Sequence, residues 1–283
     1  MKPIKVDKSK KWVGVCISPA LIGQFELENA IVVVIDVLRA TTSMCVAFGY
    51  GVRSMIPVLT TEEGLEYKRK GFLIAGERDG EQVEGFDFGN SPFSFMTEDI
   101  RGKDIVITTT NGTKAIKAAV ALHAKEVIIG AFPNLTVLCN YLIERNENIV
   151  LVCAAWKDKP NLEDTIFAGA VVNRLRPYFR LFEDSTLIAE ALFRSANRRK
   201  RYYLRSSSHF NRLYHKLQIQ RDVKYSLRRD THPVIPKLYG NHLVEINSPY
   251  AIEYEKQAQA QTHHRAQESL EGVKPREEQL NAK

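Results

Sequence analysis

The chain has 283 residues, and 44% of them are hydrophobic, so it is long enough to bury one large core or two modest ones. No unbroken apolar run approaches the roughly 20 residues that a membrane-spanning helix needs, and the charged residues 1–8 lack the apolar stretch of a secretory signal. Because no apolar run is long enough, we expect no membrane partner. The formal net charge of +7 is distributed unevenly along the chain.

Apolar, β-branched runs alternate with helical patterns through the first half of the chain. We predict strands over residues 13–18, 30–35, 52–59, 72–75, 104–109, 126–130 and 149–154. We predict helices over residues 39–49, 61–70, 113–123 and 134–145. This alternation is typical of an α/β fold with a mostly parallel sheet, right-handed crossovers and helices on both faces.

The pattern changes after a loop at residues 157–161. Helical periodicity dominates the second half, and we predict helices over 162–179, 186–200 and 210–217, followed by one strand over 236–244. We therefore place a boundary near residue 160. The predicted parts are a first α/β domain over 1–160, a helix-rich second α/β part over 161–254, and a polar tail or surface helix over 255–283.

The four cysteines are far apart in the sequence and form no C-x-x-C pair. They are Cys16, Cys45, Cys139 and Cys153. We expect them to be buried and reduced, which is typical of a cytoplasmic protein.

The most informative segment follows the apolar run 30–35. Asp36 ends that run, Arg39 follows three residues later, and Thr41 and Thr42 open a helical pattern. A buried parallel strand delivers polar groups to the carboxyl edge of a sheet in this way. An ordinary helix cap, with Arg39 paired to Asp36, would explain the same residues.

Two further clusters follow the strand predicted over 72–75. Glu77 and Arg78 lie in a loop flanked by Gly76 and Gly80, where the backbone can approach a ligand closely. The next loop, 85–92, contains Asp87, Asn90 and a serine before a proline. A plain turn into a helix that begins at the proline would explain this second loop equally well.

Hydroxyl, amide and glycine residues lie where the strand 104–109 runs into the helix 113–123. The residues are Thr110, Asn111, Gly112 and Thr113. Free backbone N–H groups at such a helix N-terminus favour an anion, and phosphate is the natural ligand. The segment lacks the G-x-x-x-x-G-K-[ST] pattern of a P-loop, and an ordinary N-cap remains an alternative.

Two adjacent acids, Glu163 and Asp164, open the helix that follows the strand 149–154. Acids in a first helical turn usually only complement the helix dipole, but here they would lie at the same sheet edge as the other clusters. The carboxylates that we expect at this edge are Asp36, Glu77, Asp87, Glu163 and Asp164. Carboxylates with few histidines suit a hard ion such as Mg²⁺, and arginines suit phosphate.

A basic block lies between Arg194 and Arg229, with twelve Lys or Arg residues and one acid, Asp222. It could be a nucleic-acid surface, a solvated helix face, or a positive wall that attracts an anionic small substrate. We do not expect nucleic acid, because no recognised nucleic-acid module accompanies the block.

These clusters occur in the same order as in the 2-phosphosulfolactate phosphatase (ComB) family, which the chain resembles over about residues 10–240. The motifs are Val-Ile-Asp36-Val-Leu-Arg39-Ala-Thr-Thr, Gly76-Glu77-Arg78, Gly85-Phe-Asp87-Phe-Gly-Asn90-Ser-Pro, Thr108-Thr-Thr-Asn111-Gly-Thr and Leu162-Glu163-Asp164. The resemblance implies a two-part α/β fold and Mg²⁺-dependent removal of phosphate from 2-phosphosulfolactate to give sulfolactate, a step that serves coenzyme M synthesis in methanogens.

The resemblance also implies roles for the matching residues. We expect metal ligands or a base at Asp36, Glu77, Glu163 and Asp164. We expect catalytic residues at Asp36, Arg39, Arg78 and Asp164, with the two arginines as anion clamps. We expect substrate contacts at Thr41, Asp87, Asn90, Thr110, Asn111, Gly112 and Thr113. One departure is that His209 precedes Phe210, where the family pattern would place a glycine.

These expectations define a phosphomonoester hydrolase in which water attacks the phosphate directly, because no nucleophile with an adjacent base is visible in the sequence. The first alternative is a catalytically silent protein of the same fold that binds an anion or RNA through the basic block. The second is another Mg²⁺-dependent phosphoryl transfer on a phosphorylated acid. A homodimer is our default expectation for the assembly.

Overall fold

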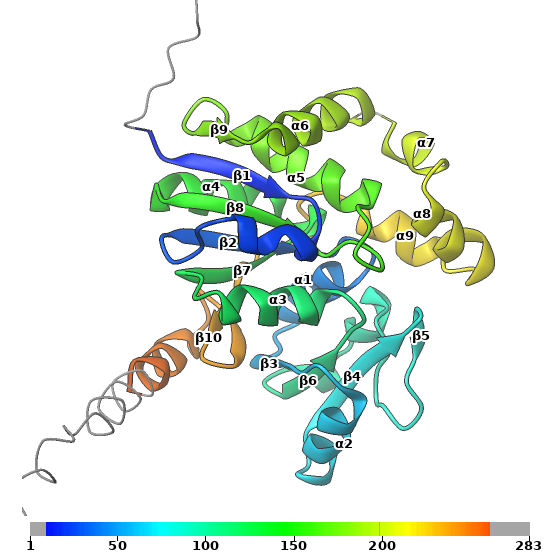
Figure 1. The fold of residues 1–283 in the computed structure, drawn as a ribbon. Coiled ribbons are helices and arrows are strands. Elements are labelled where there is room, and N and C mark those ends of the chain that lie inside the picture. Colours follow the sequence, from blue (N-terminus) through cyan, green and yellow to red (C-terminus); the bar gives the residue numbers. More distant parts are fainter. Residues whose placement is uncertain (1–9, 198, 261–283) are drawn as a thin grey trace, which may run out of the picture.

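The computed structural model describes residues 10–197 and 199–260, and the fold is α/β, as predicted (Figure 1). Its sheet has eleven strands in the order β5-β4-β6-β3-β11-β10-β7-β2-β8-β1-β9. One group of parallel strands is formed by β1 (Trp12–Cys16), β2 (Ala30–Ile35), β7 (Glu126–Gly130), β8 (Asn148–Cys153) and β9 (Arg180–Phe182). A second parallel group is formed by β3 (Ser54–Pro57), β4 (Leu73–Arg78) and β6 (Asp104–Thr108).

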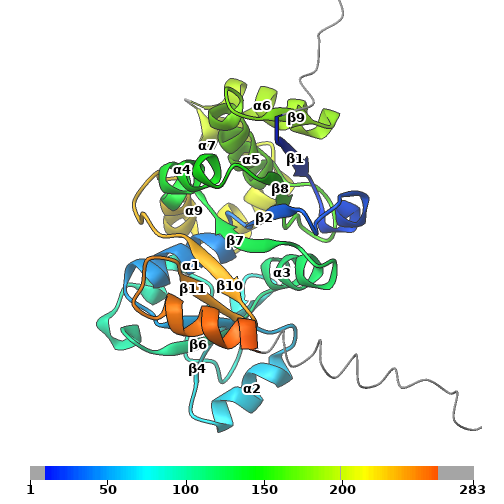
Figure 2. The same ribbon diagram turned by 90° about the vertical axis from the view of Figure 1, so that its left-hand side faces the viewer.

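A hairpin joins the two groups. Its strands, β10 (Pro236–Tyr239) and β11 (His242–Glu245), pair antiparallel with β7 and β3 respectively, and Figure 2 shows them between the two groups. Because every pairing from β7 through the hairpin to β3 is antiparallel, the strands of the second group start out in the direction opposite to those of the first. Sheet twist of roughly 20–25° per step, accumulated over the five steps from β7 to β4, turns the second group back towards the direction of the first. This is how strand ends from both groups can reach one site.

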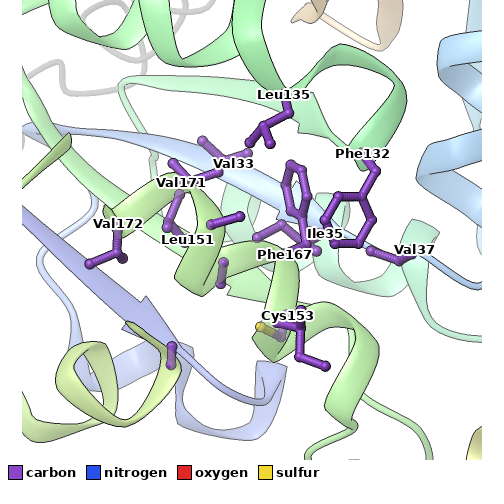
Figure 3. Packing of buried hydrophobic residues seen from close by; sticks show 14 of the residues in the cluster. Val33, Ile35, Val37, Phe132, Leu135, Leu151, Cys153, Phe167, Val171 and Val172 are labelled. Atoms are coloured by element: carbon purple, nitrogen blue, oxygen red, sulfur yellow. The ribbon is translucent and has the colours of Figure 1, made fainter. Parts of the chain in front are cut away.

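Helices cover both faces of the first group, because its central strands are apolar on both sides. The helices of this region are α1 (Ala40–Gly49), α3 (Gly112–Ala121), α4 (Leu135–Arg145), α5 (Leu162–Leu175) and α6 (Asp184–Ala196). Val33 and Ile35 of β2 pack with Leu135 and Phe167 under α4 and α5 (Figure 3). Val32 and Val34 belong to the opposite cluster, with α1 and α3. The alternation along β2 thus divides the core into two layers.

The remaining elements are short. Helix α2 (Thr61–Arg69) follows β3, and β5 (Glu81–Gln82) turns back along β4. Single 3₁₀ turns are η1 (Pro19–Gln24), η2 (Pro92–Phe95), η3 (Glu98–Ile100) and η4 (Phe132–Asn134). The segment α7 (Lys200–Leu204), α8 (Ser208–Asn211), η5 (Arg212–Lys216, a π-helical turn) and α9 (Gln220–Ser226), yellow in Figure 1, lies above β5.

The element predictions for residues 10–154 match the structure to within a few residues, and all of the later ones differ. The helix predicted over 186–200 is α6, which ends at Ala196, and the helix predicted over 210–217 is α8 followed by the π-helical turn η5. The helix predicted over 162–179 ends at Leu175, and the edge strand β9 follows it. The single strand predicted over 236–244 is the hairpin β10–β11, because Gly240 with φ 60° allows the chain to turn back at that point. Strands from both sides of residue 160 share the sheet, so the division expected there stays a prediction.

The expected tail begins within a helix that covers residues 251–260, and its remaining part, 261–283, lies outside the described residues. All four cysteines are buried and free, as predicted. In the part of the chain that the structure describes, we found no helix whose length and apolar character would let it cross a bilayer.

Candidate active site

Six of the thirteen predicted site residues line one pocket. It is lined by Asp36, Leu38, Arg39, Glu77, Asp79, Gly80, Asn90, Thr110, Asn111, Trp156, His209, Arg212 and Leu213. The ends of β2 and β4, the β6–α3 turn and the loop after β8 each contribute, and so do α8 and η5. Residues 120 positions or more apart in the sequence therefore share one cavity.

Asp36 is brought to the pocket by β2, whose six residues are all buried. Its backbone N–H donates to Thr41 Oγ1 (2.9 Å), and its Oδ1 accepts from the Ala40 N–H (3.3 Å). Burial and, second to it, the nearby Glu77 charge raise the pKa of Asp36 from 3.8 to about 6. Thr41 is thus a positioning residue in the structure, behind the carboxylate that lines the pocket.

Glu77 holds two loops of the pocket together. Its Oε1 accepts from the Thr110 N–H and its Oε2 accepts from the Gly80 N–H, each at 2.7 Å. Gly112 lies close to the same place, because a Cβ atom there would be 3.1 Å from Asp36 Oδ2 and 2.8 Å from the Ala40 Cβ. The β6–α3 turn can approach Asp36 only because this residue is a glycine.

The two acids at the start of α5 lie directly behind the pocket. Asp164 Oδ1 accepts from the Val37 N–H (2.8 Å), and its Oδ2 accepts from Asn161 Nδ2 (2.9 Å). Burial raises the pKa of Asp164 well above its usual range, and the Asp36 and Glu163 charges add to this effect. Glu163 is fully buried, and its Oε2 has no hydrogen-bond partner among the described residues.

His209 is the partner of Glu163. Its Nδ1 lies 2.5 Å from Glu163 Oε1, and its ring stacks on Trp156 with centroids 5.4 Å apart. The departure from the family pattern at Phe210 does not remove His209 from the pocket, because the Phe210 side chain turns into the core and stacks on Tyr214. Glu163 and the stacked ring hold the imidazole in one orientation, in which Nε2 lies 3.4 Å from Arg212 Nη2.

The two predicted arginines lie in different places. Arg39 lines the pocket, where its Nη1 pairs with Asp222 Oδ2 of α9 at 2.5 Å and its Nη2 donates to the Gly80 carbonyl at 2.8 Å. Arg78 points away from the pocket lining, and its guanidinium donates to Thr108 Oγ1 and to backbone carbonyls at Glu77 and Leu59. Asp222, the one acid of the basic block, is thus a buried part of the site.

Four of the seven predicted substrate contacts do not line the pocket: Thr41 and Gly112, described above, and Asp87 and Thr113. Asp87 accepts from Lys68 Nζ (3.0 Å) and from the Ile74 N–H (2.9 Å), so its carboxylate ties its loop to β4 and α2. Thr113 exchanges hydrogen bonds with Thr109 inside the first turn of α3. Asn90, Thr110 and Asn111 do line the pocket.

Sequence reasoning missed Trp156, Arg212 and Asp222 as site residues. Trp156 follows the end of β8 much as Asp36 follows β2, so its position after a buried strand was a usable signal. Arg212 and Asp222 lie in the basic block, where the spacing of charges gave no way to separate one pocket residue from its exposed neighbours.

The acids Asp36 and Glu163 fit a magnesium ion that would also be bound by phosphate oxygens of a substrate. In the residues that the structure describes, no group of three His, Cys, Asp or Glu side chains forms a ready-made metal cage. Mg²⁺ commonly takes only one or two carboxylates and completes its shell with water and phosphate oxygens. The pocket carboxylate of Asp36 and the unpartnered Glu163 Oε2 supply that chemistry.

Acids, two arginines and the N-terminus of α3 thus meet at one pocket of this α/β protein. The family model of 2-phosphosulpholactate phosphatase matches residues 16–241, and the chain belongs to this family. A protein of Thermotoga petrophila named probable 2-phosphosulfolactate phosphatase is 40% identical over 206 residues, which are 73% of this chain and 88% of the relative.

Two further relatives carry the same name. The protein of Caldanaerobacter subterraneus is 34% identical over 75% of this chain and 89% of its own length. The protein of Clostridium acetobutylicum is 30% identical over 82% of this chain and 99% of its own length. The similarity therefore spans nearly the whole of these relatives.

Proposed function

We propose that this protein hydrolyses the phosphate ester of 2-phosphosulfolactate and releases sulfolactate and inorganic phosphate, with Mg²⁺ as the cofactor. The observation that carries the proposal is Asp36, a carboxylate at the end of a buried strand that faces the β6–α3 turn and Arg39 in one pocket. The family of the chain supports the same chemistry.

The pocket residues divide the work between binding and proton transfer. Because the Thr110 N–H already donates to Glu77, the backbone N–H groups of Asn111 and Gly112, at the N-terminus of α3, bind the phosphoryl oxygens. Arg39 donates further hydrogen bonds to them, and Asp222 keeps its guanidinium in position. Asp36 orients the attacking water, which lies close to the phosphorus atom in this arrangement.

His209 and Glu163 serve the leaving group in this proposal. Glu163 accepts a hydrogen bond from Nδ1–H, and its negative charge stabilises the charged imidazole. Nε2 can then give a proton to the ester oxygen as the bond to phosphorus breaks. Asp36 and Glu163 would hold Mg²⁺, with Glu77 close by. When bound, the ion supplies positive charge for the phosphoryl oxygens and the leaving oxygen.

The test is release of inorganic phosphate from 2-phosphosulfolactate by the full chain. We expect turnover with Mg²⁺ and its loss after chelation, with recovery when the ion is added back. A protein that turns over no small phosphate ester in the presence of Mg²⁺ contradicts the proposal. Salt-dependent RNA binding by such an inactive protein would instead favour the alternative of a silent anion-binding protein.

We also propose a cytoplasmic location and a homodimer. Four buried, free thiols support the first. Light scattering on the purified protein, together with size-exclusion chromatography, measures the second.

A further inference from the structure

Among the residues that line the pocket, Arg212 is a cation whose charge the proposed reaction does not use. It opens η5, directly after the short helix that carries His209, and its side chain reaches the same pocket as Asp36. It belongs to the basic block, so its role could not be read from the sequence pattern alone.

Three contacts hold the Arg212 guanidinium in place. Its Nη1 donates to the Asp79 carbonyl at 2.7 Å. Its Cζ lies 5.1 Å from the centre of the Trp156 ring, a cation–π contact. Its Nη2 is 3.4 Å from His209 Nε2. The group is therefore preorganised against one wall of the pocket.

The Arg212 guanidinium still lacks partners. Within the described residues, Arg212 makes no ion pair, although acids line the same pocket, whereas Arg39, the other arginine of the pocket, pairs with the buried Asp222. The Arg212 Nε is buried and has no hydrogen-bond partner in that part of the chain. A buried N–H group without a partner is unfavourable unless a ligand completes its hydrogen bond.

We infer that Arg212 is the receptor for the acid group that the phosphate ester carries, a sulfonate or a carboxylate, and that it makes the enzyme selective for acidic esters. The inference rests on the proposed function. A planar guanidinium matches the paired oxygens of either acid group, and its position beside His209 places that group next to the ester oxygen. Arg39, whose charge is balanced by Asp222, binds the phosphoryl group in this arrangement.

The test compares esters that differ only in their acid groups. The substrates are 2-phosphosulfolactate, phospholactate (carboxylate only), the phosphate ester of isethionate (sulfonate only) and ethyl phosphate (no acid group, and an alkoxide leaving group that needs a proton like the others). For R212Q we expect kcat/KM on the acidic esters to fall by roughly 10²-fold, mainly through KM, and the value for ethyl phosphate to change less than about threefold. The ester with the largest fall in kcat/KM identifies the acid group that Arg212 binds.

Lys216 provides the matched control, because it is an exposed cation of the same short element. K216Q should leave all four kcat/KM values within about twofold of wild type. An equal loss on every ester in R212Q would overturn the inference, because it would mean that Arg212 only positions His209. Unchanged kinetics in R212Q would overturn it as well.

A binding measurement separates this inference from the proposed reaction. Calorimetric titration of sulfolactate into wild type and R212Q needs no turnover. We expect the variant to bind sulfolactate roughly 10²-fold more weakly. Equal affinity, or no binding to wild type, overturns the inference, whereas binding that depends on Arg212 in a protein without phosphatase activity would overturn only the proposed reaction.

Discussion

Two buried carboxylates, one outside the pocket and one in it, differ in whether a cation compensates their charge. Glu190 of α6 is 3% exposed and is paired with Arg176 and Arg194. The hydrogen bond from Arg176 lowers the pKa of Glu190. Asp36 is 8% exposed and has no cationic side chain within ion-pair distance among the described residues, and burial raises its pKa to about 6. The first acid is neutralised where it lies, and the second is left charged at neutral pH.

This difference separates structural acids from functional ones. A buried acid that only supports the fold is stable when a cation and hydrogen bonds compensate it. Asp36 and Asp164 have instead been buried near other acids: the Glu77 and Glu163 charges add to the effect of burial in raising the pKa of Asp36, and the Asp36 and Glu163 charges do the same for Asp164. Groups perturbed in this way cluster at functional sites.

The largest expected effect comes from removing the Asp36 charge. For Asp36→Asn we expect kcat/KM on 2-phosphosulfolactate to fall by at least roughly 10³-fold, because the water and the ion lose their carboxylate. At about pH 7 and without Mg²⁺, we expect the free energy of unfolding to rise by about 1–3 kcal/mol, because the folded state no longer holds an uncompensated charge. Phosphate release and urea unfolding measure the two effects.

Glu190→Gln is the matched control for Asp36→Asn. It should keep full activity and lose about 1–3 kcal/mol of stability, because Arg176 and Arg194 lose their shared acid. If both variants lost stability by similar amounts, the contrast between the two acids would be contradicted.

The second prediction concerns the pair of His209 and Glu163. Glu163→Gln keeps a hydrogen-bond acceptor for Nδ1 but removes the charge that stabilises the protonated imidazole. We expect kcat on 2-phosphosulfolactate to fall by roughly 10–100-fold. The loss should be several-fold smaller on p-nitrophenyl phosphate, whose leaving group needs no proton. Equal losses on both esters would show that Glu163 does not act through proton transfer.

Much of this site could be predicted because its parts follow buried strands. A run such as residues 30–35 identifies its own strand, and the residue after it must reach the carboxyl edge of the sheet. The sequence could not show that the Arg78 guanidinium donates to Thr108, because these residues are 30 positions apart and become neighbours only in the folded sheet. Arg212 and Asp222 were hidden for another reason, since they lie on short helices whose exposed faces are equally charged.

The third prediction tests the acid that compensates Arg39. Asp222→Asn keeps the shape of the side chain and removes its charge, so Arg39 becomes a free cation held by the Gly80 carbonyl. We expect kcat to fall by roughly 3–30-fold, while the affinity for inorganic phosphate stays equal or rises, since the phosphoryl site becomes more positive. A purely structural role would weaken phosphate binding together with kcat. Product-inhibition constants distinguish the two outcomes.

The smallest effect is a pH dependence of the stability difference between wild type and Asp36→Asn. The pKa of Asp36 is raised from 3.8 to about 6 in the folded state, so between these values the folded protein binds more protons than the unfolded chain. The contribution of Asp36 to stability is therefore complete below about pH 4 and is lost as the pH rises through about 6. The advantage of Asp36→Asn over wild type should shrink from pH 7 towards pH 4 in urea unfolding without metal.

Mg²⁺ should reverse the same difference. An ion bound at the Asp36 carboxylate stabilises only the folded wild type, by an amount that grows with the ratio of free ion to its dissociation constant. At saturating Mg²⁺ and about pH 7 we expect wild type to be the more stable protein, and the gain to fall as protons compete for Asp36 below about pH 6. A stability difference that does not respond to Mg²⁺ at either pH would mean that the uncompensated acid serves the reaction without holding a metal.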